Sequence, residues 1–218
     1  MPGKLEKFAD NRRFPNLLEY GDLKENRLEN PKGRWRECFG RNGRLVMELA
    51  CGKGDFTLGY AEQHPEEMVL GVDIKGARLW DGARRALKRD LVNVLFFRAY
   101  IEQLETYVAP GELDEIWITF PDPFPKRRQE KKRLVSPRFL RLYRHLLVPG
   151  GEVHLKTDSA LLWRYALQTI PAVGGNYCRR VEDLYSDAAD DPILTIQTSF
   201  ERQHLRDGKT IRYLRFRP

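Results

Sequence analysis

The chain has 218 residues, of which 41% are hydrophobic and 32% charged, an ordinary composition for one soluble α/β domain. Its three cysteines have no C-x-x-C spacing and support neither a disulfide framework nor a zinc site, so we expect no metal. No apolar run approaches the roughly 18 residues of a membrane span, and residues 1–10 lack the apolar core of a signal peptide. We therefore expect a cytoplasmic protein with no membrane partner.

Lysine and arginine outnumber aspartate and glutamate by 38 to 31, which gives a formal net charge of +7. A positive excess of this size favours a polyanionic partner, with nucleic acid as the leading candidate. The charge alone is equally compatible with a solubilising surface.

Residues 1–40 are polar, mixed in charge and interrupted by Pro2, Pro15, Pro31 and Gly33. Their apolar residues are too few and too irregularly spaced to build a core. We predict an N-terminal arm that is flexible or becomes ordered by RNA.

Residues 41–218 alternate short apolar runs with amphipathic segments. The runs predict strands, and the segments between them predict crossover helices, which together give a parallel sheet covered on both faces. The predicted strands are 45–49, 68–73, 92–97, 113–120 and 152–156, and the predicted helices are 56–63, 76–89, 137–147 and 159–170.

Two late strand-like segments, 177–184 and 210–217, follow without a predicted helix between them, which suggests an antiparallel hairpin at the edge of the sheet. The predicted fold of residues 41–218 is therefore a doubly wound α/β domain. Its sheet is Rossmann-like, mostly parallel and seven-stranded, with an antiparallel C-terminal edge hairpin.

A loop with two glycines, Gly52 and Gly54, follows the first predicted strand, and the second strand ends about 20 residues later in Asp73. In doubly wound folds such glycines let the backbone approach a ligand, and an acid at the tip of the second strand binds a ribose. Glu48 and Asp55 add negative charge, which disfavours a pyrophosphate and favours a cationic ligand. We predict S-adenosylmethionine, which joins an adenosine to an ammonium and a sulfonium group.

Asp122 lies between Pro121 and Pro123 at the end of the fourth predicted strand. Because proline restricts its own backbone and that of the preceding residue, this carboxylate is held in place. A basic cluster with a net charge of +5 follows and includes one acid, Glu130. Beside a positioned acid, such a cluster predicts phosphate binding rather than a solvated surface. The cluster consists of Lys126, Arg127, Arg128, Lys131, Lys132 and Arg133.

The glycine loop and Asp73 resemble those of the class I methyltransferases, and three further motifs resemble the bacterial tRNA (guanine-N7)-methyltransferase family. All four occur in the family's order and cover roughly residues 45–201. The three further motifs are Phe120-Pro121-Asp122-Pro123-Phe124-Pro125-Lys126, Lys156-Thr157-Asp158 and Thr198-Ser199-Phe200-Glu201.

This resemblance implies methyl transfer to N7 of a variable-loop guanine in tRNA, with tRNA rather than DNA as partner. The sequence leaves the choice between a monomer and a homodimer open. It implies cofactor contacts at Glu48, Gly52, Gly54, Asp73 and Asp122, with Asp122 also the catalytic residue. It implies substrate contacts at Lys126, Asp158, Thr198, Ser199, Phe200 and Glu201. The RNA backbone is expected at Arg127, Arg128, Lys131, Lys132 and Arg133.

Two positions depart from the family pattern. Ala50 stands where a first glycine is usual, so the turn either avoids positive φ or is strained. No acid ends the third strand at Ala99-Tyr100-Ile101, so we expect the adenine on a backbone amide or stacked on Tyr100.

Guanine N7 has an in-plane lone pair and no proton, so attack on a sulfonium methyl needs alignment and electrostatic stabilisation rather than a general base. We therefore expect Asp122 to act by position and charge. On local geometry alone, Asp158 is equally suited to be a helix N-cap, and Thr198 with Glu201 to be a capping box.

Two other functions are consistent with parts of the sequence. The first is an amino-methylase of a nucleobase or of glutamine, but Asp122-Pro123-Phe124 lacks the second consecutive proline of that class. The second is an inactive RNA-binding protein on a methyltransferase scaffold. Three acids facing RNA, Glu48, Asp73 and Asp122, argue against it.

Overall fold

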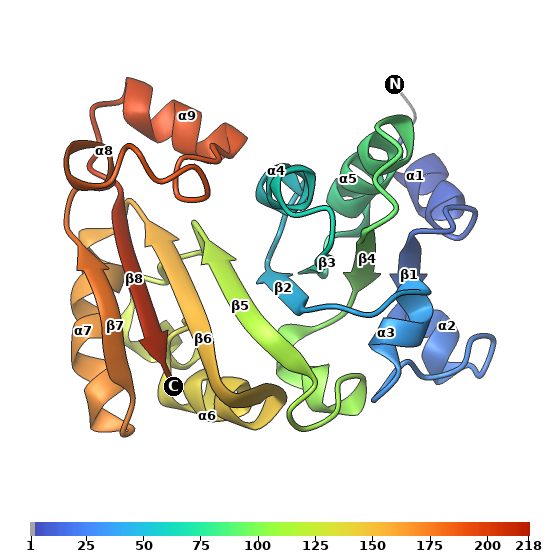
Figure 1. Cartoon of the computed structure of the whole chain (residues 1–218), viewed down its shortest axis with the longest axis horizontal. Coiled ribbons are helices and arrows are strands. Elements are labelled where there is room, and N and C mark those ends of the chain that lie inside the picture. Colours follow the sequence, from blue (N-terminus) through green and yellow to red (C-terminus); the bar gives the residue numbers. More distant parts are fainter. Residues whose placement is uncertain (1–2) are drawn as a thin grey trace.

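A single eight-stranded sheet organises the protein, whose computed structural model describes residues 3–218 (Figure 1). Its order is β1-β4-β3-β2-β5-β6-β8-β7. The strands are β1 Leu17–Glu19, β2 Leu45–Leu49, β3 Met68–Asp73, β4 Val94–Arg98, β5 Leu113–Thr119, β6 Leu147–Thr157, β7 Asn176–Val181 and β8 Arg212–Arg217. The α-helices are α1 Lys4–Asn11, α2 Tyr20–Lys24, α3 Trp35–Phe39, α4 Asp55–Gln63, α5 Gly76–Lys88, α6 Pro137–Leu146, α7 Ala160–Ala172, α8 Leu184–Asp187 and α9 Ser199–Arg206, and the 3-10 helices are η1 Ile101–Thr106 and η2 Arg127–Lys132.

Helices cover both faces of the sheet, as the alternation of strands and helices predicts. Side chains from successive residues of β2 enter opposite layers, Leu45 and Met47 on one face and Val46 on the other. The first layer contains residues of α3, η1, α6 and α7, and the second contains residues of α4, α5 and α8. A central parallel strand is buried on both faces and is therefore mostly apolar. All five residues of β2 are buried, and Glu48 is the one polar residue among them.

Strands β1 to β6 are parallel, and β8 runs antiparallel to both β6 and β7. The mostly parallel doubly wound fold and its antiparallel C-terminal strands are confirmed. The strand count of seven was wrong. So was the direct hairpin, because α8 and α9 lie between β7 and β8 in the chain.

The eighth strand comes from the segment expected to be an arm. Leu17 to Glu19 pair with Phe96 to Arg98 of β4, and α1 packs on α5. Trp35 is fully buried, and its indole nitrogen donates to the carbonyl of Tyr107 at 2.8 Å. Residues before position 40 therefore already pack on the sheet. Pro2, one of the predicted chain breakers, lies outside the described residues. A three-residue strand and a single buried tryptophan leave no periodic signal in the sequence.

Among residues 3–218, no helix is both long enough and apolar enough to cross a bilayer.

Candidate active site

A cavity of about 920 Å³ lies at the carboxyl ends of the parallel strands. Loops after β2, β3, β4, β5 and β6 line it, and the first residues of α9 contribute a further wall. Figure 1 shows α8 and α9 beyond the arrowheads of β5 and β6. Ligands bind at this edge in open α/β sheets. Of the predicted site residues, Gly52, Asp73, Tyr100, Asp122, Lys132, Asp158, Thr198, Ser199 and Phe200 line the cavity.

The other predicted site residues lie outside the lining. They are Glu48, Gly54, Lys126, Arg127, Arg128, Lys131, Arg133 and Glu201.

The glycine loop after β2 holds Asp73 in a fixed orientation. The backbone nitrogen of Gly52 donates to Oδ2 of Asp73 at 3.0 Å, and that of Lys75 donates to Oδ1 at 2.8 Å. Asp73 is 6% exposed, and each carboxylate oxygen keeps a lone pair for a ligand. Ala50, where a glycine is usual, has φ 57°, so of the two alternatives for this turn the structure has the strained positive φ. Gly54 serves packing, since a Cβ there would lie 2.7 Å from the ring of Phe96.

Glu48 lies beneath this loop. Its Oε2 accepts hydrogen bonds from the backbone nitrogen and hydroxyl of Thr57, and its Oε1 accepts one from the hydroxyl of Thr119 at 2.6 Å. Burial raises the pKa of Glu48 to about 7, although these three donors act in the opposite direction. Its predicted role in direct cofactor contact has no support in this placement, because the carboxylate supports the loop from below.

Asp122 projects into the cavity from the loop after β5. It is exposed, and its carboxylate accepts no hydrogen bond from the residues that the structure describes. The residues on either side of its Pro-Asp-Pro step are strained, with φ 49° at Phe120 and 44° at Phe124. The carboxylate is therefore placed by its backbone rather than by side-chain partners.

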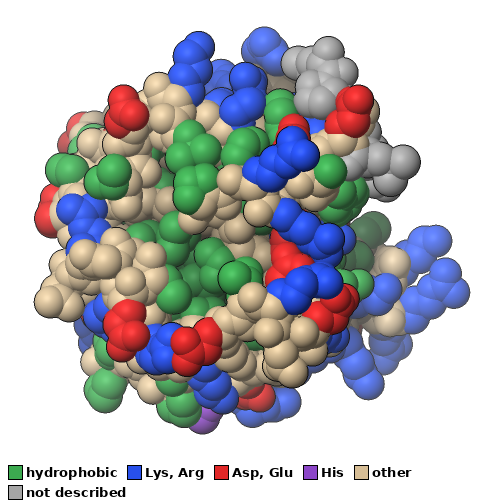
Figure 2. Space-filling model, turned by 90° about the vertical axis from the view of Figure 1, so that its right-hand side faces the viewer, with side chains coloured by type: hydrophobic (Ala, Val, Ile, Leu, Met, Phe, Trp, Pro, Cys, Tyr) green, Lys and Arg blue, Asp and Glu red, His purple; other side chains and the backbone are tan. Residues whose placement is uncertain are grey.

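The basic cluster divides into two kinds of residue. Arg127, Arg128 and Lys131 are exposed on η2, and Lys132 reaches the cavity wall. Arg133 is 3% exposed and bonds to protein carbonyls, so its predicted contact with the RNA backbone has no support in this placement. Figure 2 shows the side of the molecule on which α1, α2, α3 and β1 lie in Figure 1; on this face, hydrophobic side chains line a hollow, and lysine and arginine side chains lie beside it with acidic side chains between them.

The start of α9 supplies a wall of the cavity and is tied to the glycine loop. The backbone nitrogen of Ser199 donates to Oδ2 of Asp55 at 2.8 Å. Phe200 is 54% exposed, and Tyr100 on the β4 side is 44% exposed. Two aromatic rings that line one cavity and stay accessible suit planar ligands.

Glu201 is fully buried, unlike its neighbours Ser199 and Phe200. It forms a capping box with Thr198, the alternative that local geometry already allowed. It also pairs at 2.8 Å with Lys156, whose side chain is 0% exposed. The ammonium of Lys156 donates further to the carbonyls of Leu194 and Ile196. Direct contact of Glu201 with substrate has no support here, because both carboxylate oxygens are engaged inside the protein.

Asp158 remains a substrate candidate. Ser159, not Asp158, caps α7, since its hydroxyl accepts from the backbone nitrogen of Leu162 at 3.2 Å. Asp158 lines the cavity, where Lys209 donates to its Oδ2 at 2.9 Å and His204 lies 3.6 Å from its Oδ1.

The sequence analysis assigns no role to Lys156, His204 or Lys209, although Lys156 belongs to one of the motifs. A lysine inside an apolar strand was the one available signal, at Lys156. His204 and Lys209 join Asp158 from more than 40 positions away, a spacing that carries no local signal.

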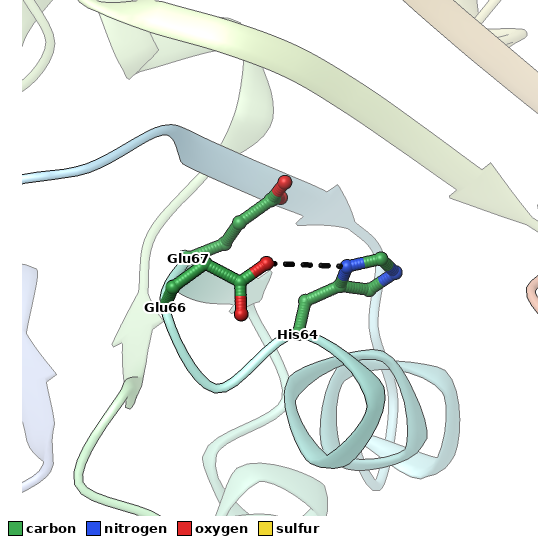
Figure 3. A group of neighbouring side chains, drawn as sticks. All are labelled: His64, Glu66 and Glu67. Atoms are coloured by element: carbon green, nitrogen blue, oxygen red, sulfur yellow. Dashed lines mark ion pairs between the residues drawn. The ribbon is translucent and has the colours of Figure 1, made fainter.

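Within residues 3–218, one group has the geometry to hold a metal ion, formed by His64, Glu66 and Glu67 (Figure 3). It lies between α4 and β3, at the opposite edge of the sheet from the cavity. Glu67 is already paired with Arg44 at 2.9 Å and accepts from the hydroxyl of Tyr60. A carboxylate so engaged is a poor ligand, and we assign no metal to it.

The doubly wound sheet with its cavity at the carboxyl edge defines a Rossmann-like methyltransferase fold. A family model described as "Putative methyltransferase" matches residues 42–214. A crystal structure of the 16S rRNA methyltransferase KamB is similar in fold, with a TM-score of 0.65 and 15% identity over 86% of this chain and 94% of that one. A similar fold occurs in the 16S rRNA (adenine(1408)-N(1))-methyltransferase with cosubstrate SAM from Catenulisporales acidiphilia, with a TM-score of 0.59 and 20% identity over 84% and 89% of the two chains.

Sequence relatives define the family more closely. A tRNA (guanine-N(7)-)-methyltransferase of Christiangramia forsetii is 41% identical, covering 98% of this chain and 97% of the relative. One from Bacteroides thetaiotaomicron is also 41% identical, covering 98% of this chain and 85% of the relative. The chain belongs to the tRNA (guanine-N7)-methyltransferase family.

Proposed function

We propose that this protein transfers the methyl group of S-adenosylmethionine to N7 of a variable-loop guanine in tRNA. The observation that carries this proposal is one cavity bordered by three groups: the anchored Asp73, the unpaired Asp122, and the residues Asp158 and Thr198 to Phe200. The near full-length similarity to tRNA (guanine-N7)-methyltransferases supports it.

The residues on the β2 to β4 side of the cavity fit S-adenosylmethionine. The free lone pairs of Asp73 suit the two ribose hydroxyls, because backbone amides hold the carboxylate in place. Tyr100 packs edge-on against Tyr20 at 5.5 Å and offers an accessible ring to the adenine. A volume of about 920 Å³ lies within the usual range of small-molecule sites. When bound, the cofactor supplies an electrophilic methyl group on a positively charged sulfur.

The residues on the α9 side fit a purine. Phe200 offers a ring face, and the carboxylate of Asp158 is held by Lys209 so that it can accept from the base edge. Asp122 lines the same cavity, and in this proposal its carboxylate stabilises the positive charge that passes to the guanine. No proton leaves N7, so Asp122 has no need to change protonation state.

One assay tests this function. The protein is incubated with methyl-labelled S-adenosylmethionine and unmodified tRNA, and the product is treated with borohydride and aniline. Strand scission at a variable-loop guanine is expected, because the N7-methylated ring is cationic and opens. Label transfer without scission would indicate methylation of another atom, as by an amino-methylase, and binding without transfer would indicate an inactive RNA-binding protein.

A further inference from the structure

Arg133 ends the basic cluster but differs from the residues before it. It is 3% exposed, whereas Arg127, Arg128, Lys131 and Lys132 are exposed. A guanidinium removed from water must find acceptors within the protein, because an unpaired buried charge is strongly unfavourable. Its partners therefore indicate what it does.

Those partners belong to the loop that begins immediately after Asp122. Nε donates to the carbonyls of Pro123 at 3.1 Å and Phe124 at 3.3 Å, and Nη2 donates to the carbonyl of Phe124 at 3.0 Å. The guanidinium also lies over the ring of Tyr165 on α7, 4.3 Å from its centroid. Glu130 contributes a longer ion pair at 3.5 Å.

The loop needs such an anchor. Phe124 has φ 44°, a conformation that a residue with a side chain keeps only when its surroundings hold it. Arg133 holds the carbonyls of Pro123 and Phe124, which belong to the peptide bonds before and after Phe124, so it fixes this turn. Because Asp122 accepts no hydrogen bond within residues 3–218, its position depends on the backbone that Arg133 restrains.

We propose that Arg133 is a positioning residue for Asp122. It closes the loop of residues 123–133 on itself and packs on Tyr165, so that the exposed arginines and lysines of η2 lie on a restrained loop that directly follows Asp122. Phosphates that bind to η2 therefore contact a loop whose first and last residues are joined by hydrogen bonds. This inference rests on the proposed role of Asp122.

The test compares Arg133→Gln with Arg133→Lys. Glutamine cannot replace the forked donor set, and lysine keeps the charge but not the planar fork. We expect kcat, per molecule competent to bind S-adenosylmethionine, to fall by about 10- to 100-fold in Arg133→Gln, since small misplacements of a catalytic group cost this much. The KM for tRNA should change less than about threefold. The kcat of Arg133→Lys should lie between those of the wild-type protein and Arg133→Gln.

A second readout reports the loop without catalysis. Trypsin should cleave after Lys126, Arg127 and Arg128 faster in Arg133→Gln than in the wild-type protein, followed by mass spectrometry. The matched control is Arg164→Gln, which removes an exposed arginine on α7 next to Tyr165 and should leave kcat and cleavage unchanged.

An unchanged kcat, or a loss confined to tRNA affinity, would overturn the proposal and make Arg133 a structural or phosphate-binding residue. If Arg133→Gln does not fold, Arg133→Lys and Tyr165→Leu decide by the same two readouts. If the wild-type protein fails to methylate N7, the proposed function fails, and the rate of loop cleavage alone then decides whether Arg133 holds the loop.

Discussion

At the scale of single residues, the site depends on acids that are held in different ways. Backbone amides hold Asp73, a lysine holds Asp158, and the backbone alone holds Asp122. Of these three acids, only Asp122 has a carboxylate with no partner among the described residues, which leaves its charge available to a bound ligand. It is therefore the residue whose removal should affect chemistry more than binding.

Replacing Asp122 by alanine should lower kcat by about 100-fold or more, the range seen when one preorganised electrostatic group is lost. The affinity for tRNA, measured by filter binding at fixed salt, should stay within about twofold. Asp122→Asn keeps the size and removes the charge, and a loss close to that of alanine would assign the effect to charge. Parallel losses of kcat and tRNA affinity would contradict the separation of these roles.

His154 links stability to pH. Burial, and then the charges of Arg215 and Arg44, lower its pKa to about 3 from an ordinary 6.5. Glu115 lies 3.4 Å from Nε2, but Arg44 neutralises it at 2.6 Å. The ring stacks on Trp117 and shares a hydrogen bond of 2.8 Å with the hydroxyl of Tyr213.

A lowered folded-state pKa means that only the unfolded chain binds the proton between pH 6.5 and 3. The His154 contribution is thus complete above pH 6.5 and is lost by about 1.4 kcal/mol per pH unit below it. Denaturant titrations of wild type and His154→Gln should give unfolding free energies whose difference is constant above pH 7 and shrinks toward pH 5. A constant difference throughout would show that the ring titrates equally in both states.

At the scale of elements, α9 reaches the site through contacts with residues that are distant in the sequence. Its capping box begins the helix, Asp55 binds its first amide, and Lys156 binds its buried Glu201. Lys156 also holds the carbonyls of Leu194 and Ile196, so one ammonium fixes both the helix and the segment that leads into it. Burial lowers the pKa of Lys156, with Glu201 acting in the opposite direction.

Lys156→Met should destabilise the protein by about 3–5 kcal/mol, because it leaves Glu201 buried without a counter-charge. Combining it with Glu201→Gln should cost less than the sum of the two single changes, as measured by a double-mutant cycle in denaturant. Lys88→Met, an exposed lysine on α5, should change stability by less than about 0.5 kcal/mol. Simple additivity would show that the pair does not anchor α9.

At the scale of the whole molecule, the net charge is positive, and η2 carries several of the exposed positive side chains. The net charge is +7, and the exposed residues of η2 place four of the positive side chains beside the cavity. Each phosphate contact that such a residue makes releases counterions, so binding should weaken as salt rises.

The double variant Arg127→Gln with Arg128→Gln should bind tRNA more weakly and reduce the slope of log K against log salt by about 0.9 for each lost contact. Its kcat at saturating tRNA should fall far less than its affinity. The control, Arg141→Gln with Arg164→Gln, removes exposed arginines from α6 and α7 and should keep the wild-type slope. An equal change of slope in both pairs would mean that the charge acts only as a diffuse field.

The sequence by itself determined the order of strands and α-helices from residue 45 to residue 181 and the residues at the ends of the parallel strands. Apolar residues recur every two positions in strands and every 3.6 in helices, and prolines such as Pro121 and Pro123 restrict the local backbone. These are local effects, so they can be interpreted without a structure. Asp73, Asp122 and Asp158, which the sequence predicts at strand ends, line one cavity, because the carboxyl ends of parallel strands share one edge.

Tertiary structure decided the rest. Whether a charged residue faces solvent or the interior depends on partners far away in the chain, and no local pattern distinguishes exposed Arg128 from buried Arg133 or accessible Phe200 from buried Glu201. The same holds for residues 3–40, where β1 exists only because β4 offers it an edge. Burial and pairing are properties of the folded whole, since a buried charge is stable only where the fold supplies its partner.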